Sequence, residues 1–459
     1  MSFTRRFILV VYILMAPAFA FAAPPAAPAL PQDVVPLPPE LDEHLKELMR
    51  TAEKYRGLEA LRSVPSGTLS EEALQRKMAQ SLREDLPPEE LKAVEASLKA
   101  FGLIPETMDL ATYYPELLST QVAGFYDPER HYLALVRREE GMLGSGAGEE
   151  KRLEDMVLIH ELTHALQDQH FNLTHISAED PLADASTARQ ALVEGDATLT
   201  MFSALTGAAM ETLPGVDAML STLLRDPKEM MAGMEDMPGA REMAAAPAWF
   251  RDMLLFSYMR GYAFCVSVKR LGGQKLLDHA FTSDPPRSSE QILHPEKWHT
   301  RRDDPIVLRW PDLSARLPGF QKLAEGELGE AGIVTLLRVR PGQANRAATA
   351  AAGWGGDRFA VFAKGNERVL AWITEWDSVA DAREFEAAAR SLGRSWGVTR
   401  QARLGPRRVL VIRGKLTKTE REALDAAASA IKAEPPANKN IDLTALGVST
   451  PRADSRREP

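Results

Sequence analysis

The hydrophobic and polar positions of this chain follow a helical period from residue 39 to about residue 118. Apolar residues recur every three or four positions in the segments LDEHLKELMRTAEKY, SEEALQRKMAQSLRED and PPEELKAVEASLKAFG. Ser70 before two glutamates and Pro87-Pro88 before two more are signals for helix N-termini. The pattern therefore predicts an N-terminal helical region over residues 39–118.

An alternating pattern replaces the helical one in QVAGFYDPERHYLALV, with Asp127-Pro128-Glu129-Arg130 at its centre, and this predicts a β-hairpin. Helical periods return in three further segments, at residues 151–169, 185–205 and 247–271. Gly272-Gly273 ends the last of these, and a shorter helix is expected up to residue 281. Residues 119–302 are therefore expected to form one mainly helical domain with a small hairpin.

The chain changes to short strands and helices from about residue 304, in GIVTLLRVR, RFAVFAKG, RVLAWITEW, DAREFEAAARSLG and RRVLVIRG. This mixture predicts a separate C-terminal α+β domain over residues 303–433. The polar segment 434–459 is expected to be a disordered tail. The fold class expected for the whole chain is α+β, in two or three domains.

The first residues have the pattern of an export signal. Arg5 and Arg6 precede an apolar run, and Ala20-Phe21-Ala22 fits the rule for signal peptidase cleavage. Residues 1–22 are therefore predicted to be a signal peptide, and the Pro/Ala-rich residues 23–38 an extended linker. An uncleaved anchor is disfavoured, because the run is short for a span of about 20 residues and contains a proline. We expect a periplasmic or secreted protein without a membrane span after cleavage.

The composition narrows the classes of partner. The formal net charge is -9 and there is no long basic run, which disfavours nucleic acid. The single cysteine, Cys265, cannot form an intramolecular disulfide, and its apolar neighbours indicate a buried packing residue. Seven methionines over residues 210–243 are interpreted as packing residues rather than a copper site or a peptide-binding surface.

The segment HELTHALQDQHF, residues 160–171, carries the chemistry. His160 and His164 lie one turn apart on one face of a helix, so both imidazoles can bind one metal ion. Glu161 is rotated by about 100° from His160 and can overhang a metal-bound water. This H-E-x-x-H pattern combines two metal ligands with a general base.

Two residues compete to be the third ligand. His170 would need a sharp turn after His164, but Gln167 stands where a glycine would permit that turn, and a continuing helix carries His170 about 9 Å along the axis. Glu194 lies in an apolar helix segment, ARQALVEGDATLTMF, where a buried carboxylate needs a partner. We therefore favour Glu194. Its neighbour Asp196 is predicted to accept a hydrogen bond from a ligand histidine, with a local helix contact as the alternative.

HELTH followed by VEGDA resembles the gluzincins, the thermolysin-like branch of the MA clan of peptidases. This resemblance implies Zn²⁺ held by His160, His164 and Glu194, with Glu161 as the base and a protein or peptide as substrate. Independently of the resemblance, Gly195 beside Glu194 is expected to let the two site helices approach closely. VAGFYDP, HELTHALQDQHF, ALVEGDA and SSEQILHPEKW also occur in the order seen in a family of uncharacterised exported bacterial proteins. That likeness covers about residues 115–300.

Two further parts of a hydrolytic site are expected. QVAGFY, residues 121–126, is a candidate edge strand for binding a substrate backbone, with ordinary sheet packing as the alternative. His294 is the first candidate to stabilise the oxyanion, followed by Tyr258 and Tyr262. Two other functions stay open: a zinc amide hydrolase acting on cell-wall or other non-protein substrates, and a non-catalytic scaffold with structural zinc.

Overall fold

The computed structural model describes residues 30–448 with short gaps at 139–140, 143–147, 177–179, 181, 225–238, 314–316, 341, 343, 366 and 393–395. The predicted signal peptide and residues 23–29 of the Pro/Ala-rich linker lie outside the described residues, as do four of the methionines between residues 210 and 243. The described chain is a mixed α+β protein, in agreement with the expected fold class.

The N-terminal region contains four helices: α1 (Pro39–Arg56), α2 (Glu71–Asp85), α3 (Pro88–Phe101) and α4 (Leu110–Gln121). The first three are the predicted helices. The Ser70 side chain accepts from the N–H of Ala73 and so caps α2, while Pro88 opens α3. Two strands were not predicted, β1 (Val35–Pro36) and β2 (Ser66–Ser70). The end of the supposed linker is therefore a paired strand.

The predicted hairpin is present as β3 (Gly124–Asp127) and β4 (Tyr132–Arg138), followed by β5 (Gly141–Met142). The strand order is β1-β2-β4-β3, with β5 also paired to β4 and β2 parallel to β4. The N-terminal region and the hairpin therefore share one sheet. No domain boundary separates them near residue 118.

The middle of the chain is helical, as expected. The long helices α5 (Glu149–Phe171), α7 (Asp184–Thr206) and α12 (Gly261–Thr282) dominate it, and a π-helix, η2 (Phe256–Arg260), leads into α12. The shorter elements are α6 (Leu173–Ile176), η1 (Met210–Thr212), α8 (Val216–Leu223), α10 (Ala240–Ala245), α11 (Ala248–Leu255), α13 (Ser289–Leu293) and α14 (Glu296–His299). The predicted break in α12 is confirmed at Gly273, which has a φ of 63°. Cys265 is buried in this helical core, as expected.

The C-terminal part is built on a five-stranded antiparallel sheet of order β10-β11-β9-β8-β7. Its strands are β7 (Gln321–Gly326), β8 (Trp354–Lys364), β9 (Glu367–Trp376), β10 (Val398–Arg403) and β11 (Arg408–Arg413), and a separate pair joins β6 (Val307–Arg309) to β12 (Lys432–Glu434). Its helices are α15 (Gly329–Arg338), η3 (Ala344–Arg346), α16 (Ala347–Ala351), α17 (Val379–Leu392) and α18 (Lys418–Ser429).

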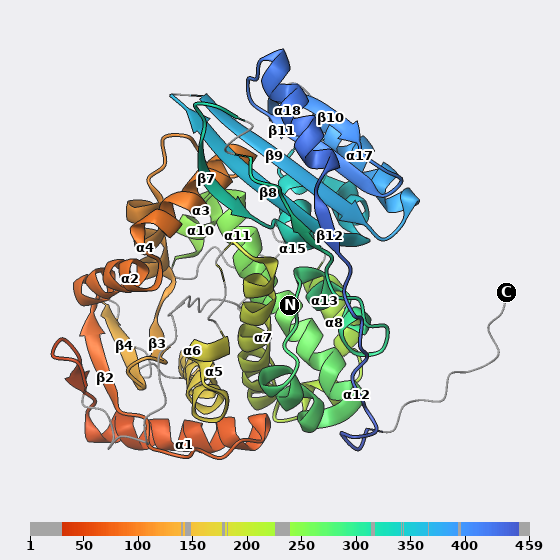
Figure 1. The fold of residues 1–459 in the computed structure, drawn as a ribbon. Helices are drawn as coiled ribbons and strands as arrows, with labels where there is room; N and C mark the ends of the chain where they lie inside the picture. The colour runs from red at the N-terminus through yellow and green to blue at the C-terminus, as the bar shows by residue number, and fades with distance from the viewer. Residues whose placement is uncertain are drawn as a thin grey trace.

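This sheet does not stand apart from the rest of the chain. Phe101 of α3 makes edge-to-face contacts with Phe359 and Trp372, at ring-centroid distances of 5.2 Å each. Figure 1 shows the C-terminal sheet across the top, the small sheet at the lower left above α1, and α7 running upright between them. An N-terminal helix therefore shares a hydrophobic core with the C-terminal sheet. The C-terminal region is not as separate from the rest of the chain as predicted.

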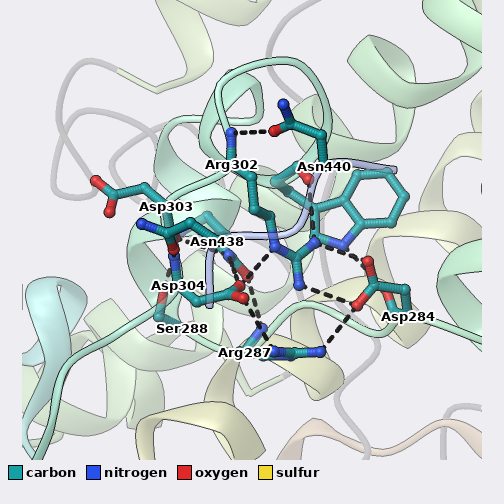
Figure 2. A network of polar contacts seen from close by, with 10 residues as sticks. Asp284, Arg287, Ser288, Arg302, Asp303, Asp304, Asn438 and Asn440 are labelled. Atoms are coloured by element: carbon teal, nitrogen blue, oxygen red, sulfur yellow. Dashed lines mark hydrogen bonds and ion pairs between the residues drawn. The ribbon is translucent and has the colours of Figure 1, made fainter. Parts of the chain in front are cut away.

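The expectation of a disordered tail is wrong for residues 434–448. Asn438 Oδ1 accepts from the N–H of Asp304 at 2.8 Å, and Asn440 Oδ1 accepts from the N–H of Arg302 at 3.2 Å. Figure 2 shows both asparagines within the polar network around Arg302. Leu443 and Val448 are buried in the same cluster as α7 and α12. The tail is polar on average, but these two apolar residues pack against the helical core. Residues 449–459 lie outside the described chain.

Among the described helices, none is long and apolar enough to cross a membrane.

Candidate metal centre

Three side chains converge between α5 and α7, which pack against each other. His160 and His164 stand one turn apart on α5, with their Nε2 atoms 3.1 Å apart. The Oε2 atom of Glu194, on α7, lies 3.2 Å from Nε2 of His160 and 3.5 Å from Nε2 of His164. All three side chains are buried. The structure thus brings together the three predicted ligands, which could hold one metal ion.

The glycine beside Glu194 has a different neighbour from the one expected. A Cβ on Gly195 would collide with the backbone of Gly261, the first residue of α12, and a Cβ on Gly261 would collide with the backbone oxygen of Ala191. Gly195 therefore permits close approach of α7 to α12, and the expected approach to α5 is corrected. Two glycines facing each other let α7 carry Glu194 deep into the helical core.

Glu161 is held at the site by one of its two carboxylate oxygens. The backbone N–H of Tyr126, on β3, donates to Oε2 at 3.0 Å. The other oxygen, Oε1, is buried and has no hydrogen-bond partner among the described residues. Burial, and to a lesser degree the nearby Glu194 carboxylate, raise the pKa of Glu161 to about 8. A buried acceptor without a donor is costly, so Oε1 is suited to receive a proton or a hydrogen bond from a ligand.

The other predicted part beside α5 is the edge strand. β3 packs against α5 and lies at one end of its sheet. It begins at Gly124, because Gln121 still belongs to α4, so the strand is shorter than the predicted QVAGFY segment. The Tyr126 N–H points away from the neighbouring strand β4 and toward Glu161. The unpaired edge of β3 therefore faces the site.

Gln167 orients His164 from the adjacent turn of α5. Its Oε1 lies 2.8 Å from Nδ1 of His164, while its Nε2 donates to the Val193 carbonyl at 3.0 Å and to Oδ2 of Asp196 at 2.8 Å. Both partners of Nε2 are acceptors, which fixes the orientation of the amide. His164 therefore carries its proton on Nδ1 and presents Nε2 to the site. The prediction that Asp196 contacts a ligand histidine is corrected: Asp196 acts through Gln167.

Arg56 neutralises Asp196 from the end of α1. Its Nε donates to Oδ2 of Asp196 at 2.5 Å, and its Nη1 donates to Oδ1 of Asp278, on α12, at 2.9 Å. The guanidinium also lies 5.5 Å from the ring centroids of Phe171 and Phe281. Arg56 is only 1% exposed. A chain of contacts thus runs from His164 through Gln167, Asp196 and Arg56, which are buried, to the partly exposed Asp278, and it joins four helices.

The charges of the three clustered side chains depend on one another. Burial disfavours the charged form of His164, yet the Glu194 carboxylate outweighs it and raises the pKa of His164 to about 9. Burial also disfavours ionised Glu194, but the two imidazoles lower its pKa to about 2. Burial lowers the pKa of His160. Without a metal, the cluster is held by an ion pair between His164 and Glu194.

The candidates for oxyanion stabilisation are placed differently. Tyr258, on the π-helix, stacks on His160 with a centroid distance of 5.6 Å and an interplanar angle of 20°. Tyr262 is part of the hydrophobic core and contacts Phe202. Nε2 of His294 is 3.1 Å from Oε1 of Glu330 on α15. The role of His294 stays a prediction, whereas Tyr258 lies beside the site.

His170 does not reach the cluster. Its Nε2 lies 2.8 Å from the backbone carbonyl oxygen of Glu59, near the C-terminal end of α5. This agrees with its rejection as the third ligand.

A second group of acids, Glu290, Asp303 and Asp377, also lies close together. The ammonium group of Lys297 contacts all three carboxylates, at 2.6 to 3.0 Å. This cluster is therefore occupied by a cation of the protein itself.

Comparison with known proteins bears on the C-terminal sheet alone. A family model described as a domain of unknown function (DUF8575) matches residues 316–425, which run from just before β7 into α18. This stretch contains none of the residues of the candidate metal centre. No curated protein and no solved structure matches the chain.

Proposed function

We propose that this protein is an exported zinc metallopeptidase that hydrolyses peptide bonds at the centre formed by His160, His164 and Glu194. The spacing of the three ligand atoms carries the proposal. Zinc bound at about 2.0–2.1 Å in a tetrahedron requires ligand atoms about 3.3–3.4 Å apart. The three separations here are 3.1, 3.2 and 3.5 Å. A triangle of this size supports a zinc site with one position left for substrate or water.

The chemistry of the donors supports the same assignment. Two imidazoles with one carboxylate form a ligand set typical of catalytic zinc. The hydrogen bond from Nδ1 of His164 to Gln167 leaves the lone pair of Nε2 available to bind a metal ion. When bound, zinc supplies Lewis acidity, which polarises the scissile carbonyl and makes water more acidic.

The chain's own residues divide the remaining work. Oε1 of Glu161 accepts the proton of the attacking water and then donates it to the leaving amine. The N–H of Tyr126 holds Oε2 of Glu161, so the carboxylate keeps its orientation during both transfers. The outer edge of β3 offers backbone groups on which an extended substrate can pair. Tyr258 packs against His160 and limits the movement of that ligand.

Four variants and two measurements test the proposal. Glu161→Gln should keep its zinc, measured by metal analysis, but lose hydrolysis by about 10²-fold or more, because its base is gone. His164→Ala and Glu194→Ala should lose both zinc and hydrolysis. His170→Ala, on the same helix but outside the cluster, is the matched control and should retain both.

Casein and a peptidoglycan fragment are the two substrates. Full casein hydrolysis by Glu161→Gln, or an unchanged zinc content in Glu194→Ala, would refute the assignment. Cleavage of the peptidoglycan fragment without cleavage of casein would keep the zinc hydrolase and reject the peptidase.

A further inference from the structure

A cavity outside the metal centre lies where the N-terminal helices meet α7 and the C-terminal sheet. Its volume is about 280 Å³. Helices α2, α3, α4 and α11 contribute lining residues, as do the first half of α7 and Phe359 of β8. Three regions that are distant in sequence therefore build one cavity, and none of them could form it alone.

The lining is apolar and contains no basic residue. Leucine, methionine and aromatic side chains provide most of it, and its charged members are Asp184 and Glu327. Burial is the main cause that raises the pKa of Asp184 to about 8 and that of Glu327 to about 7, so both carry less negative charge at neutral pH than ordinary acids. An anionic ligand would meet no cation here. The lining fits an uncharged apolar group.

The cavity adjoins the metal centre along two elements. Gln190 lines the cavity and precedes Glu194 by one turn of α7, so their Cβ atoms are about 5–6 Å apart. Ser257 also lines it and directly precedes Tyr258, whose ring stacks on His160. Asp184, another lining residue, lies about 15 Å from Glu194 along the helix axis. The cavity therefore begins next to the ligands and extends away from them along α7.

The volume sets the size of the group that fits. An apolar cavity of about 150 Å³ accommodates one benzene molecule. A cavity of 280 Å³ therefore holds about two aromatic or branched side chains. Alternate side chains of an extended peptide point the same way and are about 6.5–7 Å apart. Two of them fit within the length of α7 that lines the cavity.

We propose that this cavity is a specificity site that receives two bulky apolar side chains, at alternate positions on one side of the scissile bond of a peptide substrate. The inference rests on the proposed peptidase function, and it adds the substrate class. Peptides with leucine or phenylalanine at both positions are preferred over those with serine there. The preference is roughly 10- to 100-fold in kcat/KM, because an apolar pocket gains this much binding from the additional carbon atoms of a large side chain.

The test fills the cavity from α3. Val94 lines it, and Val94→Trp adds bulk inside, whereas Lys92→Trp adds the same group on the exposed side of the same helix. Fluorogenic peptides with Leu and Phe, or with Ser, at the two positions report kcat/KM for each variant. A dansyl-labelled reduced-amide peptide of the Leu/Phe sequence, which cannot be cleaved, reports binding by fluorescence polarisation. Phe250→Ala, which enlarges the cavity, is the second variant and is followed with peptides that carry tryptophan.

The proposal predicts that Val94→Trp lowers kcat/KM and binding of the Leu/Phe peptide about 10-fold or more, with no change for Lys92→Trp. If Val94→Trp does not fold, Phe250→Ala decides: a gain for tryptophan peptides over leucine peptides supports the cavity, and no gain overturns it. Equal cleavage of the apolar and serine peptides by wild type overturns the inference and leaves the peptidase standing. Tight binding without any cleavage, lost in Val94→Trp, supports the cavity and rejects the peptidase.

Discussion

Replacing Arg56 by methionine tests whether the chain of contacts behind His164 shapes the candidate metal centre. Methionine fills much of the same space but removes the charge and every N–H donor. Asp196 is 1% exposed, so its carboxylate would lose its only cationic partner among the described residues without access to water. Asp278 is 31% exposed at its side chain and can be solvated instead. The loss is therefore concentrated at Asp196.

Breaking a buried ion pair by removing one partner costs about 3–5 kcal/mol. Gln167 still donates to Asp196 in the variant, which places the expected loss in the free energy of unfolding near the lower end, about 3 kcal/mol. The same change loosens the group that orients His164, and such outer partners are worth about 10- to 100-fold in metal affinity. Stability and zinc affinity should therefore fall together.

Urea denaturation of the metal-free protein gives the first quantity, and competition with a zinc chelator gives the second. Lys54→Met, on the exposed face of α1, is the matched control and should change the free energy of unfolding by less than about 0.5 kcal/mol. Adding Asp196→Asn to Arg56→Met should recover part of the loss, because the stranded charge is removed. The reasoning fails if Arg56→Met behaves like Lys54→Met in both measurements.

Three further predictions concern stability. Gly195→Ala should lower the free energy of unfolding by about 3 kcal/mol, because the added Cβ meets the Gly261 backbone. Gly405→Ala, with open space around its Cβ, is the control and should leave the melting temperature unchanged; equal melting temperatures for the two variants would contradict the close approach. A chain ending at residue 434 should have a free energy of unfolding about 3–6 kcal/mol lower than one ending at residue 448, because Leu443 and Val448 are buried in the core. Equal midpoints of urea denaturation for the two chains would refute this. Burial lowers the pKa of His299 to about 4, so the stability that the neutral imidazole contributes above about pH 6.5 is lost as the pH falls toward 4. Wild type should therefore lose about 2 kcal/mol more between pH 7 and pH 4.5 than His299→Gln does, and identical pH profiles would exclude this role of His299.

The helices of this protein could be predicted because their information is local. Apolar periods and cap residues such as Ser70 lie within each segment, and α1, α2, α3, α5 and α7 follow them closely. Strand β2 could not be found this way. Its sequence, SGTLS, has little β-propensity, and its pairing with β4 is parallel and joins residues more than sixty positions apart. A strand that depends on distant partners leaves no periodic signal of its own.

The same distinction applies to the candidate site. His160, Glu161 and His164 share one helix turn, and an acidic residue in an apolar helix suggested Glu194. Gln167 was also within reach of sequence reasoning, because it lies three residues after His164 and so on the same face. Arg56 was not, since 140 residues separate it from Asp196 and nothing in the sequence of α1 marks it as buried.

The docked segment at residues 434–448 affects the order in which this protein becomes complete. It is synthesised after every other element described, yet Leu443 and Val448 belong to the core that surrounds α7, the helix that carries Glu194. Without these residues, that core would have an uncovered apolar surface. The core around Glu194 is therefore complete only when residues 434–448 have docked.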